Sequence, residues 1–218
     1  FWRDTPVAEA LDAHVRAGKP LGGTSAGLAI LGEYIYGAMD GSSQVSPRAL
    51  ADPLGSGNTI ETGLLHIDAL KGVITDTHFS ERGRLGRLAA FIAKAETLSG
   101  GRPVFGLGVD EDAALAVEGD GRARVYATAP GAGALVVRGG FAQAQAEDEP
   151  MQLDRLETVG VGADSVLHLP SGRVERPLFD QHYAIRDGVL MALDAPLLVI
   201  HGGAGVERGD LTPVEETA

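Results

Sequence analysis

The sequence contains no cysteine, which excludes disulfide bonds and metal sites built from thiolates and is typical of a cytoplasmic protein. It has no apolar run of about 18 residues, so the pattern predicts no membrane-spanning segment. Positive charge is scarce, because 18 lysines and arginines face 30 aspartates and glutamates, for a formal net charge of −12. So acidic a chain repels other polyanions, which argues against nucleic acid as a partner.

Glycine, by contrast, is abundant. The 31 glycines among 218 residues are roughly twice the usual share, and they lie in clusters without a fixed period. This distribution favours an α/β protein with tight turns over a collagen-like or low-complexity chain. The sequence begins with Phe1 and enters a helical pattern almost at once, so we expect an N-terminal piece to precede it, along with any signal peptide.

Hydrophobic periodicity divides the chain into alternating elements. It predicts helices over 5–18, about 26–36 and 82–98, the first capped by Thr5 with Pro6 in its first turn. It predicts a very short strand at 21–22, a long loop over 39–63 and a buried strand at 72–76. Four strands separated by turns follow over 102–137. Helices alternating with strands first and hairpins later predict an α/β three-layer sandwich with an antiparallel edge.

Gly23-Thr24-Ser25-Ala26-Gly27 matches the Gly-X-Ser-X-Gly pattern of a nucleophile elbow. Small neighbours let the backbone turn sharply from strand to helix, which exposes the serine hydroxyl. The Ala26 amide can then face an oxyanion, helped by the positive end of the helix. Because the chain is so rich in glycine, a chance glycine turn is the alternative.

A nucleophilic serine needs a base, and His78 has the most suitable position of the six histidines. It ends the buried strand "VITDTHF", where site residues of open α/β sheets lie. The alternative is a structural histidine bonded to a carbonyl. His14 is expected on the surface of the first helix and His66 in the core.

The base in turn needs a carboxylate to orient it, and the pattern leaves that choice open. Asp76 is two positions before His78 on one strand, so both are expected on the same face. Glu111 follows the strand "VFGLGV", at another carboxyl-terminal strand end. Asp110 and Asp112 are further candidates, although a run of three acids is more commonly a solvated turn.

Three motifs together resemble the cyanophycinase branch of the cyanophycinase/dipeptidase E serine peptidase family. They are "GGTSAG" (22–27), "DTHFSERGRLGRL" (76–88) and "FGLGVDEDAALAV" (105–117), within a similarity over about residues 1–172. The resemblance implies a class I glutamine-amidotransferase-like fold, with a mostly parallel sheet and antiparallel edge hairpins. It also implies a homodimer and a Ser–His–Glu triad that uses no metal or cofactor.

Carried over by motif, Ser25 is the nucleophile, His78 the general base and Glu111 the residue that orients His78. The Ala26 amide supplies one half of the oxyanion hole. In the family the other half lies on a glycine loop upstream of the first helix, which this sequence lacks. The Gly-X-Ser-X-Gly pattern also occurs in lipases and esterases, but those enzymes place the acid before the histidine along the chain, which argues against this interpretation.

The substrate that the resemblance implies is cyanophycin, a poly-aspartate with arginine on each side-chain carboxyl, cleaved to β-Asp-Arg dipeptides. Arg82, Arg84 and Arg87 would hold substrate carboxylates, and Asp76 would receive the substrate's arginine. A solvated helix start is the alternative for the arginines, although three cations there oppose the helix dipole.

The sequence departs from the family pattern at two positions that border the triad. Thr77 stands where cyanophycinases usually have Gln, and Asp112 where they usually have Asn, and these changes bear on the identity of the substrate more than on the chemistry. An aspartyl or isoaspartyl dipeptidase of the same fold is therefore an alternative. An inactive fragment or binding module is another.

The end of the chain carries a second resemblance. "PLLVIHGGAGVERGDLTPVEETA" (196–218) is similar to the opening of the plant-type asparaginase/isoaspartyl peptidase family, which cleaves β-aspartyl dipeptides. The alternative is a buried strand with a glycine turn. We therefore expect a serine peptidase domain over 1–172, a linker over 173–195 and the start of a fused domain from 196.

Overall fold

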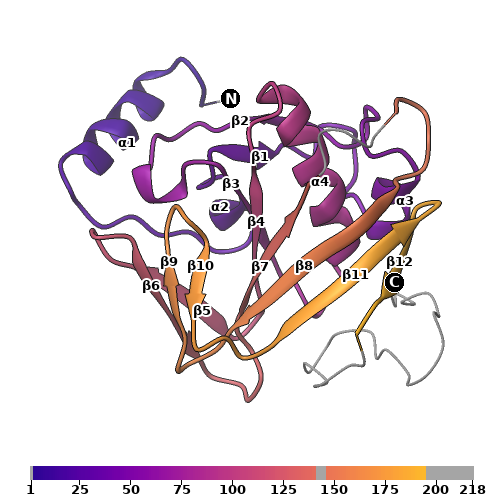
Figure 1. Cartoon of the computed structure of the whole chain (residues 1–218). Coiled ribbons are helices and arrows are strands. Elements are labelled where there is room, and N and C mark those ends of the chain that lie inside the picture. The colour runs from indigo at the N-terminus through magenta and orange to yellow at the C-terminus, as the bar shows by residue number, and fades with distance from the viewer. Residues whose placement is uncertain (1, 141–145, 195–218) are drawn as a thin grey trace.

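The computed structural model describes residues 2–140 and 146–194 (Figure 1). Its helical elements are α1 (Pro6–Arg16), α2 (Ala26–Ala29), α3 (Ser46–Ala51), the 3-10 turn η1 (Asp68–Leu70) and α4 (Leu85–Leu98). None of the described helices has the length and apolar character needed to cross a membrane.

A central sheet has the spatial strand order β12-β11-β8-β7-β4-β3-β1-β2. These strands are β1 (Tyr34–Tyr36), β2 (Ile60–Thr62), β3 (Val73–Thr77), β4 (Phe105–Val109), β7 (Ala134–Gly139), β8 (Leu153–Val161), β11 (Asp180–Arg186) and β12 (Val189–Ala192). Strands β1, β3 and β4 run parallel to one another, and the strands on either side pair antiparallel. The predicted α/β class with antiparallel flanking strands is confirmed.

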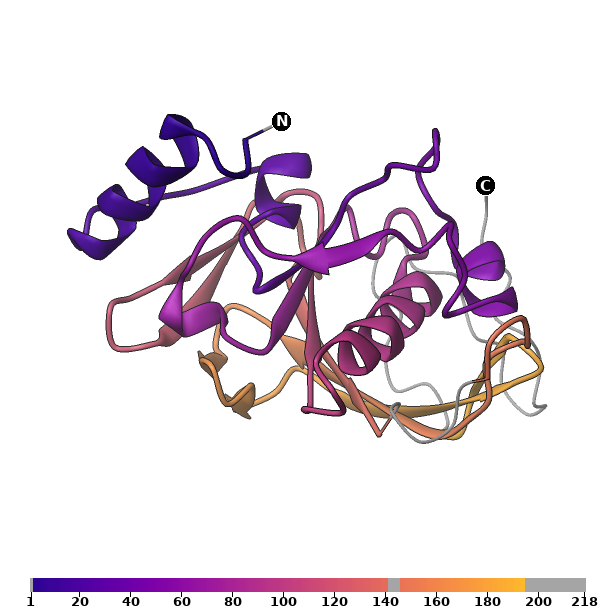
Figure 2. The same cartoon turned by 90° about the horizontal axis from the view of Figure 1, so that it is seen from above.

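The sheet lies between two other layers. Helices α3 and α4 cover one face (Figure 2). A second sheet packs on the other face in the order β10-β9-β6-β5, formed by β5 (Ala113–Val117), β6 (Arg122–Ala127), β9 (Val166–His168) and β10 (Arg173–Glu175). This arrangement agrees with the predicted three-layer sandwich.

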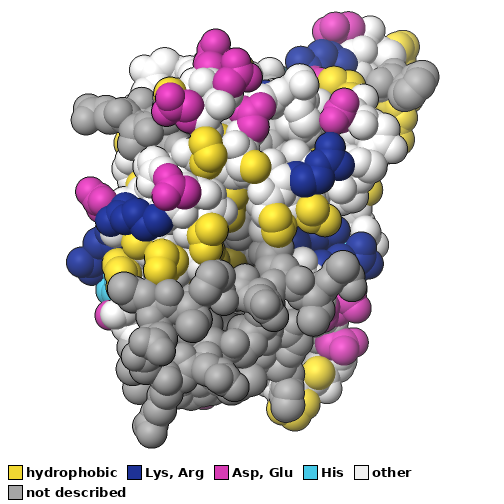
Figure 3. All heavy atoms as spheres, turned by 90° about the vertical axis from the view of Figure 1, so that its right-hand side faces the viewer, with side chains coloured by type: hydrophobic (Ala, Val, Ile, Leu, Met, Phe, Trp, Pro, Cys, Tyr) yellow, Lys and Arg dark blue, Asp and Glu magenta, His cyan; other side chains and the backbone are white. Residues whose placement is uncertain are grey.

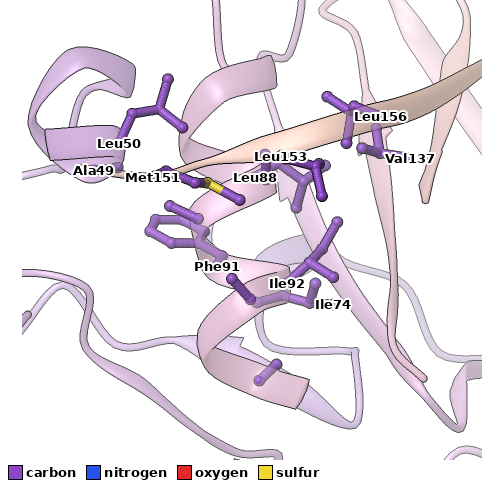
Figure 4. Close-up of a cluster of buried hydrophobic side chains, with 14 of the residues drawn as sticks. Ala49, Leu50, Ile74, Leu88, Phe91, Ile92, Val137, Met151, Leu153 and Leu156 are labelled. Carbon is purple, nitrogen blue, oxygen red and sulfur yellow. The ribbon is translucent and has the colours of Figure 1, made fainter. Parts of the chain in front are cut away.

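Helix α4 supplies the centre of the larger hydrophobic core (Figure 4). Leu88, Phe91 and Ile92 are spaced by three and one residues, so they share the face that meets the sheet, and each is at most 1% exposed. They contact the cluster that includes Leu50 of α3 and Ile74 of β3. Burial of each such side chain contributes about 1.5–3 kcal/mol, which makes α4 the main support of the strands beneath it.

Two glycines of β4 let this layer approach closely. A Cβ at Gly106 would lie 2.7 Å from the Leu88 side chain, and one at Gly108 would lie 2.4 Å from the ring of Phe79. Phe79 is 2% exposed and directly follows His78. The alternation Gly-Leu-Gly in β4 therefore sets the position of the chain that carries His78.

Helix α1 forms as predicted, with Thr5 at its N-cap and Pro6 in its first turn. None of its residues is buried, and it lies at the edge of the molecule (Figure 1). Polar contacts join its end of the chain to β2 and to the segment that follows β2: Arg3 pairs with Glu61 at 3.0 Å, and Asp12 pairs with His66 at 2.9 Å. The prediction of a core position for His66 was wrong, since its side chain is 83% exposed.

Local pattern also misjudged the segments next to Ser25. The helix predicted to reach residue 36 ends at Ala29, because Tyr34–Tyr36 forms a strand that pairs with β2 and β3. The predicted strand at 21–22 is absent from the described structure at those residues. The predicted loop over 39–63 contains α3 and β2.

The predicted linker over 173–195 instead contributes strands β10, β11 and β12 in its described part. A turn at Asp187 and Gly188, with φ of 49° and 75°, joins β11 to β12. Positive φ at both positions is the geometry of a tight hairpin, and Asp-Gly is a typical sequence for it.

On the face toward β11 and β12, described acidic and basic side chains are interspersed (Figure 3). The predicted second domain from residue 196 lies outside the described residues.

Candidate active site

Ser25 lies in a strained turn immediately before α2. Its φ of 50° and ψ of −123° are unusual for a residue with a side chain. A Cβ on Gly23 would lie 2.2 Å from the carbonyl oxygen of Gly27, so the turn closes only with glycine at position 23. The Ser25 carbonyl accepts hydrogen bonds from Leu28 and Ala29 at 3.0 Å each, which ties the turn to α2. The strained backbone leaves Ser25 exposed.

His78 meets Ser25 from the end of β3. Its Nε2 lies 3.0 Å from Ser25 Oγ, and its Nδ1 lies 2.5 Å from Glu111 Oε1. With Glu111 ionised, Nδ1 carries the hydrogen and donates it to the carboxylate. Nε2 is then free to accept a hydrogen bond from the serine hydroxyl.

Parallel pairing of β3 with β4 explains how His78 and Glu111, which are 33 positions apart along the chain, come together. Thr77 is opposite Val109 at the carboxyl ends of the two strands. His78 is therefore one residue past the end of β3, and Glu111 two residues past the end of β4. A φ of 47° at His78 then turns its side chain out of the strand's alternation.

Asp76 faces away from this group and toward α4. Arg87 donates from Nε to Asp76 Oδ2 at 2.8 Å and from Nη2 to Oδ1, and Arg84 Nη1 lies 3.6 Å from Oδ1. The three side chains are nearly fully buried. The expectation that Asp76 shares a face with His78 fails, because strand alternation does not extend through a residue with positive φ.

The three arginines differ in what they can reach. Arg87 also donates to the carbonyl of Gln44 at 3.0 Å, and Arg84 donates to the carbonyl of Thr77 at 2.7 Å. Burial and the nearby charge of Arg87 lower the pKa of Arg84 to about 10. Arg82 differs from both, because its side chain is 54% exposed and its Nη2 lies 3.6 Å from Glu111 Oε1.

The neighbours of Glu111 have separate structural roles. Asp110 is buried and accepts from the Ser80 hydroxyl at 2.6 Å and from the Gly133 amide at 2.9 Å, which anchors the end of β4. Asp112 is exposed, has a φ of 55°, and accepts from the Thr128 amide through its carbonyl at 2.8 Å. Of the four candidate carboxylates, only that of Glu111 is hydrogen-bonded to His78 in the described structure.

The other described histidines have partners elsewhere. His14 pairs with the carbonyl of Pro20 and His168 with Glu175, each at 2.9 Å. His201 lies outside the described residues.

One group of potential metal ligands lies away from the serine, where Glu157, Asp180 and His182 bring ligand atoms within 4.8 Å of one another. Arg155 Nη2 lies 2.7 Å from His182 Nε2, so a guanidinium already occupies the nitrogen that a metal would need. The geometry of these residues does not favour a metal centre.

Sequence reasoning missed two residues that support the arrangement of Ser25, His78 and Glu111. Phe79 fills the space above Gly108 and so places His78. Glu81 accepts a hydrogen bond from the Glu111 amide at 3.0 Å through Oε1. The glycine alternation in β4 could have revealed the first, because glycine within a strand often marks a close approach. A contact between loops 30 residues apart leaves no local signal, which explains why the second was missed.

No family model matches the chain. It is 37% identical over 119 residues to a cyanophycinase of Trichormus variabilis, covering 54% of this chain and 34% of that protein. It is 39% identical over 123 residues to a cyanophycinase of Thermosynechococcus vestitus, covering 56% of this chain and 33% of that protein. It is 33% identical over 169 residues to a cyanophycinase of Geminocystis herdmanii, covering 73% of this chain and 54% of that protein.

The chain is thus cyanophycinase-like in sequence, and it spans between about a third and about half of the length of these curated relatives.

Proposed function

We propose that this cyanophycinase-like chain is a serine-type hydrolase that cleaves cyanophycin to β-Asp-Arg dipeptides. The observation that carries the proposal is the continuous hydrogen-bonded series from Ser25 through His78 to Glu111, with lengths of 3.0 and 2.5 Å. The strained turn at Ser25 adds to it, because such strain concentrates at functional sites.

In the proposed reaction, Ser25 Oγ attacks the aspartyl carbonyl carbon while its proton passes to His78 Nε2. Glu111 stabilises the imidazolium through the hydrogen bond at Nδ1. The Ala26 amide, at the start of α2, supplies one donor to the developing oxyanion. His78 then protonates the leaving amine, and a water molecule activated by the same imidazole hydrolyses the acyl-enzyme.

The charges around the triad support a substrate with both acidic and basic groups. We assign the substrate's carboxylate to Arg82, whose exposed guanidinium lies beside Glu111. The exposed carboxylate of Asp112 is available to the substrate's guanidinium. Asp76, Arg84 and Arg87 have buried partners, so we propose that they build the floor of the site and hold Thr77.

An aspartyl dipeptidase of the same fold is the second candidate. It is favoured by Thr77, whose hydroxyl lies 3.3 Å from Arg84 Nη1 and therefore faces inward. The longer Gln that is usual in the family at this position could instead reach a substrate. Turnover of α-Asp-X dipeptides in preference to cyanophycin would support this candidate over the polymer hydrolase.

The test follows β-Asp-Arg release from cyanophycin granules by mass spectrometry. We expect Ser25→Ala to abolish release and Glu111→Gln to lower the rate on the order of 10²–10⁴-fold, since the imidazole loses its orienting charge. Ser56→Ala, at an exposed serine outside the site, is the matched control. Turnover retained by Ser25→Ala would refute the assignment of the nucleophile, and a near-normal Glu111→Gln rate would refute that of the acid.

A further inference from the structure

We infer that Glu81 is a positioning residue, which holds the backbone of Glu111 and thereby the carboxylate that orients His78. The inference rests on the triad of the proposed function. Glu81 lies three residues after His78, in the loop between β3 and α4, and its Oε1 accepts the Glu111 backbone N–H at 3.0 Å. One loop thus carries both the proposed base and the group that fixes the partner of that base.

The backbone at Glu111 needs such a support because it lies between two sheets. Strand β4 ends at Val109 in the central sheet, and β5 begins at Ala113 in the smaller one. The Asp110 amide still bonds across to Gly133 at 3.0 Å, but Asp112 has left the extended conformation with a φ of 55°. In the described structure the Glu111 amide therefore forms no hydrogen bond to a neighbouring strand, and it donates to the Glu81 carboxylate instead.

The two ends of Glu111 are held by successive residues of this loop. Glu81 accepts from its backbone amide, and Arg82 Nη2 lies 3.6 Å from its Oε1, the same oxygen that meets His78 Nδ1. A carboxylate that is 43% exposed would otherwise move among several rotamers. Because displacement of a catalytic group by about 1 Å can reduce the rate about 10²-fold, this support matters to catalysis.

Glu81 carries a stability penalty that a purely structural residue would avoid. Its Oε2 is buried and has no hydrogen-bond partner among the described residues, and a buried polar atom without a partner is unfavourable. A methionine fills similar volume without the buried oxygen, so Glu81→Met should retain or raise stability while it loses the acceptor for the Glu111 amide. A glutamine keeps that acceptor.

The experiment measures the rate at which a fluorophosphonate probe labels Ser25, together with the thermal midpoint Tm, in wild type, Glu81→Gln and Glu81→Met. Probe labelling needs the activated serine but no particular substrate. We expect Glu81→Met to slow labelling about 10- to 100-fold with an unchanged or higher Tm. Glu81→Gln should stay within about threefold of wild type, because it restores the acceptor. Glu118→Met, at an exposed turn between β5 and β6, is the matched control.

Labelling of Glu81→Met at the wild-type rate would overturn the inference and leave the triad standing. Equal slowing of both Glu81 variants would also overturn it, because the charge and not the acceptor would then matter. Slowing of Glu81→Met with a lower Tm would show a general structural role instead. Ser25→Ala reports on the proposed function separately: wild type that labels no faster than Ser25→Ala would refute the triad itself, and the inference with it.

Discussion

Adding a single methyl group to β4 tests whether packing beneath the site controls its chemistry. In Gly108→Ala, the new Cβ would lie 2.4 Å from two atoms of the Phe79 ring, well inside van der Waals contact. Phe79 is 2% exposed, so its ring cannot move into solvent. The ring must shift within the core, and the backbone that joins it to His78 shifts with it.

The same strand offers a matched comparison. In Gly106→Ala, the new Cβ would lie 2.7 Å from Leu88 of α4, which, unlike Phe79, does not adjoin Ser25, His78 or Glu111 in the sequence. Overpacking costs about 1–3 kcal/mol at either position, which lowers the Tm by roughly 2–12 °C for a domain of this size. Stability should therefore fall in both variants, whereas catalysis should fall mainly in Gly108→Ala.

The assay combines a thermal melt, which gives the Tm of each variant, with the rate of serine labelling by a fluorophosphonate, measured well below the lower Tm. We expect labelling to fall about 10²-fold in Gly108→Ala, since a shift of about 1 Å breaks the 3.0 Å contact between His78 and Ser25. Gly106→Ala should stay within about threefold of wild type. Equal losses of labelling in the two variants, or none in Gly108→Ala, would refute the reasoning.

Three further predictions concern the surroundings of the site. Asp76→Asn should lower the free energy of unfolding by about 3–5 kcal/mol, measured in urea, because it leaves the Arg87 guanidinium buried without its counter-charge. Gly23→Ala should abolish serine labelling, because the added Cβ would lie 2.2 Å from a backbone oxygen. Acid should loosen α1 before α4, as seen by hydrogen exchange. The hydrogen bond from His66 lowers the pKa of Asp12, so its stabilising effect is present above about pH 4 and is lost as pH falls through the lowered value.

Each of these has a contrary result. An Asp76→Asn protein as stable as wild type would show that Arg87 is held by its other partners. A labelled Gly23→Ala protein would mean that the elbow tolerates a side chain. Equal exchange in α1 and α4 throughout acidification would show that the contact between Asp12 and His66 does not hold the helix.

Elements with strong local signals could be predicted from the sequence. Helix α1 begins after a capping threonine, and the apolar spacing of α4 is regular. Strands β4 to β7 follow from alternation broken by glycine turns. By contrast, the predicted helix was carried through Tyr34–Tyr36, although Tyr and Ile are enriched in strands, and the partners β2 and β3 of this strand could not be read from local pattern. Strand β11 likewise depends on β8, which lies further back in the sequence, whereas β10 and β12 pair with the strands immediately before them.

By itself the sequence determined which residues stand at the sharp turn and at the two strand ends, because glycine spacing and apolar runs are local properties. It left four carboxylates as candidates for the partner of His78. Only the tertiary structure decided among them, because each carboxylate goes to whichever cation or amide folding brings near. Arg87 of α4 takes Asp76, and Ser80 and Gly133 take Asp110, while Asp112 is exposed and has a φ of 55°. Of the four, Glu111 is the one hydrogen-bonded to the imidazole in the described structure.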